Sequence, residues 1–159
     1  MRKLARILHM TTFLLLAMLI IVSIAVPPLT RGEKAVRTAV EKLGCRYVFR
    51  EAGPKKFDCS GLIKYCYSQF GFELEHSAQV MGYDENYRTL RYPFQFAVGD
   101  LIFFDTVNDR DECDHVGIWM GGNRFVHASS SKKKVMISEF DEYWRESFSW
   151  GKRLLCPFF

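Results

Sequence analysis

The stretch that decides the fold is FDCSGL, residues Phe57–Leu62. Apolar residues at helical spacing follow it and stop at Gly71, which predicts a helix that begins near Cys59. Asp58 is then the expected N-cap, and Cys59 lies in the first helical turn, where free N–H groups and the helix dipole favour thiolate over thiol. We therefore predict that Cys59 is a nucleophile. The alternative is an inert buried residue, which is the usual place of a lone cysteine.

A second stretch carries two histidines on what reads as one β-hairpin. Residues 114–120 alternate like a strand, Gly-Gly-Asn forms a tight turn, and residues 124–128 resume as a strand. His115 and His127 then lie on neighbouring strands at similar distances from the turn. Thiol catalysis needs one imidazole to take the proton from the cysteine and a further polar group to fix the tautomer of that imidazole. A single histidine at a strand start is more often a polar edge residue, so it is the combination with Cys59 that indicates catalysis.

These motifs resemble the NlpC/P60 cell-wall peptidases. FDCSGL is similar to the nucleophile motif of that family, and HVGI (115–118) and FVHA (125–128) are similar to its two histidine motifs. VGDLIFF (98–104) resembles the Pro-Gly-Asp-Leu strand, and GCRYVF (44–49) resembles the Gly-x-x-Tyr-x-Trp segment. Ser77-Ala78-Gln79 stands where the family often has a Ser-x-x-Gln type segment. The resemblance covers roughly residues 33–155 in the right order and spacing.

The chain departs from the family pattern at two places. Arg50 and Glu51 follow the tyrosine segment, where the family commonly has Gly-Gly. Glu75 and His76 stand before the serine segment, where the family commonly has arginine. Both regions are expected to border the substrate groove, so the departures bear on the choice of peptide and not on the catalytic groups.

The resemblance implies an α+β, papain-like NlpC/P60 fold in which N-terminal helices pack on a five- to six-stranded antiparallel sheet. The residue pattern also predicts helices first and strands afterwards, which is typical of an α+β domain. Its expected helices span 32–43 and 76–85, and a loop rich in Tyr, Arg and Phe spans 86–97. The expected strands span 101–104, 116–120, 124–128, 135–138 and 150–155.

The resemblance also implies the chemistry. Cys59, His115 and His127 match the groups of a Cys-His-His thiol mechanism, in which no metal or organic cofactor is needed. Oxyanion or substrate-binding roles fall on Tyr47, Asp58 and Ser60. The implied substrate is the stem peptide of bacterial peptidoglycan, cut most often between γ-D-glutamate and a diamino acid. The alternatives are a thiol acyltransferase or amidase acting on lipid or other amides, and a non-catalytic wall-binding module.

Residues 1–30 form a separate segment. Arg2, Lys3 and Arg6 make a basic start, and residues 13–26 contain only Ser23 as a polar residue. That run has the length of a signal-peptide core and is shorter than the roughly 20 residues that span a bilayer. We expect a cleaved signal peptide or an uncleaved membrane anchor, followed by a proline spacer and one catalytic domain over 31–159. The protein is then exported to the periplasm or wall, with membrane contact only through this segment.

Composition and charge limit the partners. The 159 residues are 48% hydrophobic and 15% aromatic, which is typical of a globular domain. Three of the 22 basic residues lie in the N-terminal segment, so the remainder carries 19 basic against 18 acidic side chains. A nearly neutral domain argues against a nucleic-acid partner. No oligomeric state is predicted.

The remaining four cysteines are candidates for disulfides, because an exported protein can pair them in three ways. No spacing among the cysteines and histidines resembles a zinc site. The four are Cys45, Cys66, Cys113 and Cys156.

Overall fold

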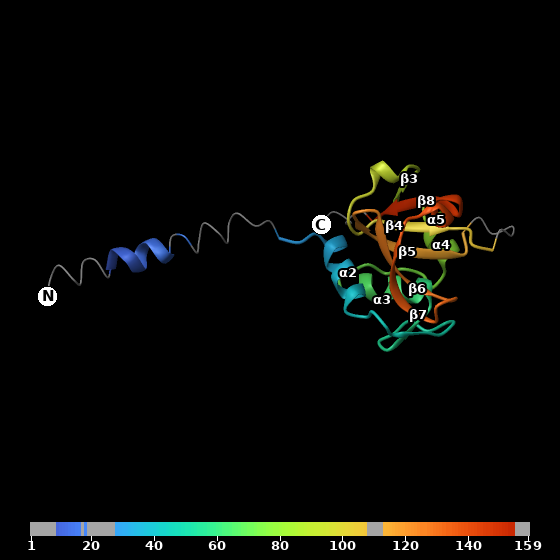
Figure 1. The fold of residues 1–159 in the computed structure, drawn as a ribbon, viewed down its shortest axis with the longest axis horizontal. Helices are drawn as coiled ribbons and strands as arrows, with labels where there is room; N and C mark the ends of the chain where they lie inside the picture. The colour runs from blue at the N-terminus through green and yellow to red at the C-terminus, as the bar shows by residue number, and fades with distance from the viewer. Residues whose placement is uncertain (1–8, 17, 19–27, 108–112, 155–159) are drawn as a thin grey trace.

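The computed structural model describes residues 9–16, 18, 28–107 and 113–154. In the domain, helices α2 (Arg31–Val40) and α3 (Cys59–Ser68) pack against each other and against the central strands of a curved sheet (Figure 1). The α+β class predicted from the sequence is confirmed. Helices α2, α3 and α4 (Ala78–Tyr83) come before strands β3 to β8, and a short helix, α5 (Glu142–Glu146), lies between β7 and β8.

The sheet differs from the expected five or six antiparallel strands. In the described part of the chain it has eight strands in the order β2-β1-β7-β6-β5-β4-β8-β3, and it is mixed because β1 and β2 run parallel. The extra strands have only two or three residues, too few to produce an alternating pattern in the sequence. The strands are β1 (Arg46–Tyr47), β2 (Lys56–Phe57), β3 (Arg88–Leu90), β4 (Leu101–Phe104), β5 (His115–Gly121), β6 (Arg124–Ser129), β7 (Lys134–Glu139) and β8 (Phe148–Arg153).

The central strands confirm the sequence prediction closely. β4 to β7 agree with the expected strands to within about one residue at each end, and β8 begins two residues earlier than expected. The predicted loop over 86–97 is wrong in part. It contains β3 and a 3-10 turn, η1 (Pro93–Gln95). Phe94 in this turn and Tyr92 just before it stack their rings in an exposed position.

The helix boundaries follow from local hydrogen bonding. Thr30 caps α2 and forms a reciprocal capping box with Glu33. The helix ends at Val40 and not at residue 43, because the chain continues as a series of turns up to Gly44. Helix α4 (Ala78–Tyr83), capped by Ser77, confirms the short helix expected over 76–85. Helix α5 (Glu142–Glu146), capped by Asp141, was not predicted.

The core lies on both faces of the sheet. Alternate residues of a strand point to opposite faces, so β4 sends Leu101 and Phe103 to the helical side and Ile102 and Phe104 to the other. On the helical side the α2 and α3 residues bury their apolar stripes. On the second side, a smaller aromatic cluster packs beneath α5.

One close approach locks α2 to the sheet. A Cβ on Gly99 would lie 2.2 Å from the Cα of Gly32, and Gly99 has a φ of +93°. Only glycine fits this position, for reasons of both space and backbone conformation. The hydroxyl of Tyr67 on α3 also donates a hydrogen bond to the carbonyl of Gly99. Both helices are therefore tied to the turn that leads into β4.

Residues 9–16 of the N-terminal segment are helical. Among the described residues, the structure has no helix that is long and apolar enough to cross a membrane. Most of the expected signal or anchor segment, residues 1–8, 17 and 19–27, lies outside the described residues. Among the described residues, no disulfide joins Cys45, Cys59, Cys66 and Cys113, and Cys156 lies outside the described residues.

Candidate active site

Cys59 lies where the sequence predicted, at the first residue of α3. Asp58 is the N-cap, and its Oδ1 accepts a hydrogen bond of 2.7 Å from the N–H of Gly61. A Cβ on Gly61 would lie 2.2 Å from the carbonyl oxygen of Glu51, so this turn of the helix packs directly on the preceding loop. The Cys59 sulfur points toward β5, 4.0 Å from the carbonyl oxygen of Asp114.

Cys59 is protonated in this environment, contrary to the thiolate expected from its place at a helix start. Burial, and then the negative charge of Asp58, raise the pKa of the Cys59 thiol to about 11. The backbone N–H groups of Ser60, Val116 and Cys59 itself lower the pKa of this thiol, but their effect is smaller. Desolvation therefore outweighs the helix terminus.

The two histidines meet as predicted, in a hydrogen-bonded row across three strands. His115 on β5 and His127 on β6 are joined by a bond of 2.8 Å between Nε2 and Nδ1. His127 Nε2 lies 3.0 Å from the hydroxyl oxygen of Ser138 on β7. If His127 Nε2 donates to Ser138, its Nδ1 accepts from His115 Nε2–H. That assignment leaves Nδ1 of His115 free of a proton and able to accept one.

Both imidazoles are neutral near pH 7. Burial lowers the pKa of His115 to about 4, against a smaller opposite effect from the charge of Asp114. Burial and then the neighbouring His115 lower the pKa of His127 to about 3. Trp144 on α5 contributes to this burial, because its ring stacks on His115 at 5.6 Å between centroids and lies 5.2 Å from His127.

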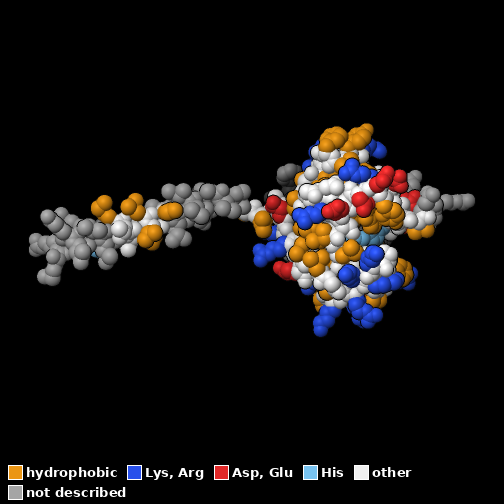
Figure 2. Space-filling model, viewed as in Figure 1, with side chains coloured by type: hydrophobic (Ala, Val, Ile, Leu, Met, Phe, Trp, Pro, Cys, Tyr) orange, Lys and Arg blue, Asp and Glu red, His pale blue; other side chains and the backbone are white. Residues whose placement is uncertain are grey.

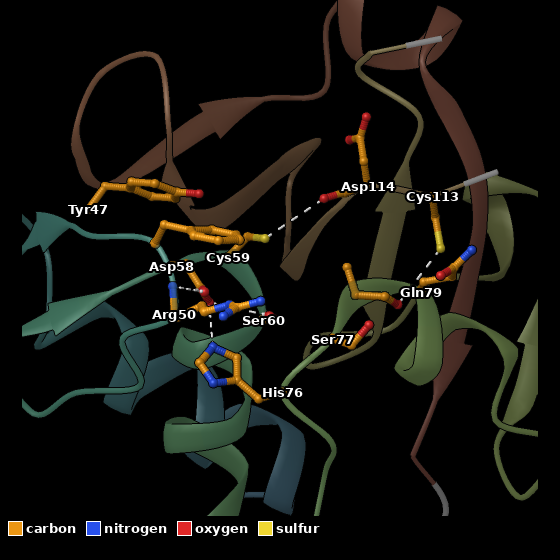
Figure 3. Close-up of a pocket in the computed structure, with 12 residues that line it drawn as sticks. Tyr47, Arg50, Asp58, Cys59, Ser60, His76, Ser77, Gln79, Cys113 and Asp114 are labelled. Atoms are coloured by element: carbon orange, nitrogen blue, oxygen red, sulfur yellow. Dashed lines mark hydrogen bonds and ion pairs between the residues drawn. The ribbon is translucent and has the colours of Figure 1, made fainter. Parts of the chain in front are cut away.

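A cleft of about 350 Å³ opens beside Cys59. Figure 3 shows Tyr47 and Cys59 together at one end of the pocket, and Ser77, Gln79 and Cys113 at the other. Within the described residues, the cleft wall includes all the predicted site residues except the two histidines, which lie outside the lining.

Tyr47 is half-buried on β1, and its phenol stays protonated. Burial, followed by the charges of Cys59 and Asp58, raises the pKa of Tyr47 to about 12. A protonated phenol is a hydrogen-bond donor, which is the property that an oxyanion requires. The hydroxyl of Ser60 is engaged with Asp58 Oδ1 at 3.3 Å.

Asp58 organises the loop around Cys59. Besides the cap, its Oδ2 accepts a 2.7 Å bond from the N–H of Arg50, and its Oδ1 lies 2.8 Å from Nε2 of His76. Asp58 is only 5% exposed, and its carboxylate is shared between three segments of chain: the Arg50 loop, α3 and the segment before α4. His76, which occupies a position where the family commonly has arginine, therefore contacts Asp58 directly.

Sequence reasoning missed Ser138, Trp144 and the contacts of Arg50 and His76. Ser138 is two positions beyond Met136, the β7 residue that pairs with His127, so it lies on the same face of the sheet. The register of that hairpin would have identified it. Trp144 gave no signal, because it belongs to a five-residue helix on the far side of the histidines.

In the described part of the chain, no group of three or more His, Cys, Asp or Glu side chains could hold a metal ion.

A family model described as "NlpC/P60 family" matches residues 44–153, which include both the nucleophile and the histidine strands. This chain belongs to the NlpC/P60 family. Murein DD-endopeptidase MepS/murein LD-carboxypeptidase of Escherichia coli K12 is 34% identical over 116 residues, or 70% of this chain and 57% of that protein. Gamma-DL-glutamyl hydrolase of Bacillus subtilis is 32% identical over 133 residues, covering 82% of this chain and 31% of that protein.

The NlpC/P60 fold is also found in solved structures. NlpC2 from Trichomonas vaginalis superposes with a TM-score of 0.72 at 30% identity, over 81% of this chain and 48% of that one. The chain spans only about half the length of the curated relatives it matches. The likeness therefore establishes the NlpC/P60 domain.

Proposed function

We propose that this protein is a cysteine peptidase that hydrolyses peptide bonds in peptidoglycan stem peptides, at the bond between γ-D-glutamate and a diamino acid. The proposal rests on the row His115–His127–Ser138 and on the capped Cys59, whose sulfur lies 4.0 Å from the carbonyl oxygen of Asp114, the residue before His115. The names of the similar proteins support the substrate: two of them denote a murein endopeptidase and a gamma-DL-glutamyl hydrolase.

Cys59 acts as the nucleophile and His115 as the general base. As the sulfur forms its bond to the carbonyl carbon, the thiol proton passes to Nδ1 of His115 and the carbonyl electron pair moves onto oxygen. Tyr47 and the backbone N–H groups at the start of α3 stabilise that oxyanion. Collapse of the intermediate breaks the C–N bond, and the proton on His115 goes to the leaving amine.

Water completes the cycle. His115 takes a proton from water as its oxygen attacks the acyl-enzyme, and collapse returns that proton to the Cys59 sulfur as the acid departs. His127 fixes the tautomer of His115 throughout, and Ser138 fixes that of His127. Because thiol and imidazole both start neutral, the proton transfer belongs to the attack itself and not to a preformed ion pair.

Asp58 and Ser60 hold the nucleophile in place. Both line the cleft, so substrate can reach them, and both are bonded to each other and to the start of α3. We assign them to positioning Cys59 and to shaping the part of the cleft that receives the acyl side of the peptide.

The decisive experiment is digestion of purified peptidoglycan and isolated stem peptides by the full chain, read by mass spectrometry. We expect fragments that end at γ-D-glutamate, and we expect Cys59→Ala to abolish them. Cys113→Ala is the matched control, because it removes another thiol that lines the same cleft and should leave the fragments unchanged.

Two other outcomes would replace the proposal. Consumption of phospholipid or simple amides by the native chain, with intact peptidoglycan, indicates a thiol acyltransferase or amidase. Binding to peptidoglycan that is equal for the native chain and Cys59→Ala, without any fragments, indicates a wall-binding module.

Residues 1–30 are proposed to direct export, with the catalytic domain in 31–159 on the outer side of the membrane. Mass spectrometry of the chain recovered from cell fractions tests this. A product that begins after residue 25 indicates a signal peptide, and an intact chain in the membrane fraction indicates an anchor. An intact chain in the cytoplasm contradicts export.

A further inference from the structure

Arg50 stands at the cleft in a backbone conformation that favours glycine. Its φ is +62°, in the left-handed region that side chains other than Gly, Asn and Asp rarely adopt. The N–H of Arg50 donates to Asp58 Oδ2 at 2.7 Å, so this conformation is fixed by the residue that precedes Cys59. The backbone therefore fixes where the Arg50 side chain starts relative to Cys59.

The guanidinium of Arg50 belongs to an exposed side chain that lines the cleft. Its central carbon lies 5.5 Å from the centre of the Phe49 ring, and both side chains line the pocket with Cys59. Figure 3 shows the Arg50 side chain extending into the pocket beside Asp58. Arginine packed on an aromatic ring loses less freedom when it binds a ligand, because its planar donors are already oriented.

Within the described part of the chain, Arg50 forms no ion pair with an acidic side chain. The two carboxylates of the cleft are already engaged. Asp58 accepts bonds from Gly61, from Arg50 N–H and from the His76 side, and Asp114 accepts from the N–H groups of Thr106 and Val107. The cleft therefore offers a cation whose donors are available to a substrate anion.

A separate group of cations lies at the edge of the sheet. Arg46 on β1 is in register with Lys56 on one side and Lys134 on the other, so three exposed cations stand in a row across the edge of the sheet. Figure 2 shows Lys and Arg side chains gathered at the lower end of the domain, the end at which β7 lies in Figure 1. None of the three lines the cleft, because Arg46 points to the opposite face of the strand from Tyr47, so Arg50 is the cation of this region that the cleft presents.

Resting on the proposed function, we infer that Arg50 determines specificity by binding the free α-carboxylate of a γ-linked glutamyl residue on the acyl side of the scissile bond. In a γ-linkage the scissile carbonyl belongs to the glutamate side chain, so the α-carboxylate stays unmodified a few bonds away. Arginine binds a carboxylate through two parallel N–H···O bonds, and an α-carboxamide cannot reproduce them. The cleft then selects the carboxylate form over the amide form.

The test compares two synthetic stem peptides that differ only in an α-carboxylate or an α-carboxamide on the γ-linked glutamyl residue. Their binding to the full chain carrying Cys59→Ala is measured by calorimetry, so that no peptide is consumed. We expect the carboxylate peptide to bind roughly 10- to 100-fold more tightly, as for hydrogen bonds between charged groups.

Three variants in that background decide the role of Arg50. Arg50→Gln should bring the ratio of the two affinities close to one, and Arg50→Lys should keep part of the preference. Gln and Lys, like Arg, are unbranched at Cβ. The left-handed backbone at residue 50 is therefore strained equally in the native chain and in these two variants. Lys134→Gln removes a nearby cation that does not line the pocket, and it should leave the ratio unchanged.

The inference is overturned if Arg50→Gln weakens both peptides equally, if the ratio survives in that variant, or if neither peptide binds at millimolar concentration. Turnover by the chain with native Cys59 is measured separately. A carboxylate preference that depends on Arg50, without hydrolysis of either peptide, contradicts the proposed function and leaves the binding role in place. Equal hydrolysis of both peptides supports the function and removes the role of Arg50.

Discussion

The ring of Trp144 packs on His115 and His127 and contributes to their burial. The pKa of His115 depends on that burial. The low pKa of His115, about 4, comes from burial, and a general base must be neutral to accept a proton. In the proposed mechanism, in which His115 is the general base, hydrolysis by the native chain should therefore continue well below pH 6. The lower edge of its pH profile reports the protonation of this base.

Trp144→Ala exposes the pair and raises the pKa of His115 toward its ordinary value near ~6.5. Below that pKa the base is charged, so the acid limb of the profile of kcat/KM should move to higher pH by at least about one unit. Tyr143→Ala, at the exposed neighbour on α5, is the control and should leave the limb in place. An unchanged limb in Trp144→Ala would show that another group controls the acid side.

At the scale of single residues, the sequence predicted those that local motifs identify. Cys59 and Asp58 follow from the start of a helix, and the two histidines follow from a short hairpin. Ser138, Trp144 and His76 lie 11, 17 and 18 residues from the groups they contact, on segments whose packing the sequence does not reveal. The protonated state of Cys59 was also missed, because burial is a property of the assembled fold.

Helix α3 begins with a cap that also holds two neighbouring segments. Asp58→Ala removes the acceptor for the N–H groups of Gly61 and Arg50 and the partner of His76. An ordinary cap contributes about 1 kcal/mol, and bonds to a charged acceptor contribute about 1.5–3 kcal/mol each. We expect a loss of about 3 kcal/mol in the free energy of unfolding, measured with urea.

Asp141→Ala is the matched control for that cap. Asp141 caps α5 with one bond, from the N–H of Trp144 at 3.2 Å, and it is exposed. Asp141→Ala should lower the free energy of unfolding by only about 1 kcal/mol. Equal losses in the two variants would mean that Asp58 does no more than cap its helix.

Strands of four or more residues and helices of six or more were predictable, and shorter elements were not. β5, β6 and β7 alternate over enough residues to be recognised, whereas β1 and β2 have two residues each and exist only because neighbouring strands pair with them. The mixed sheet follows from that parallel pair. Helix α5 has a good cap at Asp141 but only five residues, too few for a helical period.

For the whole domain, the contact between Gly32 and Gly99 joins the helical layer to the sheet. Gly99→Ala places a methyl group 2.2 Å from the Cα of Gly32 and strains a φ of +93°. The two layers must then separate, so we expect a loss of about 2–4 kcal/mol in the free energy of unfolding.

Gly71→Ala separates the two causes. Gly71 has a φ of +81°, and a Cβ there would meet nothing within 4 Å. Gly71→Ala should lower the free energy of unfolding only through the strained backbone conformation, by about 1 kcal/mol. Thermal or urea unfolding of both variants measures the difference. Equal losses would mean that the helical layer and the sheet accommodate the methyl group at residue 99 without a further cost in free energy.

The class and family of the domain could be predicted because several short motifs occur in a fixed order along the chain. The order of strands within the sheet could not, because it depends on which edges remain open after the central strands pair. β3 is an example: it reaches the sheet by pairing with β8, more than sixty residues further along the chain.

The buried thiol of Cys59 has a consequence for chemical durability. Peroxides and foreign disulfides react with thiolate and hardly at all with thiol, so a cysteine with a pKa of about 11 resists oxidation at rest. In the proposed mechanism, its nucleophile forms only when a carbonyl arrives and His115 takes the proton. If the domain is exported as proposed, such a thiol needs no reductant to keep it reduced in an oxidising compartment.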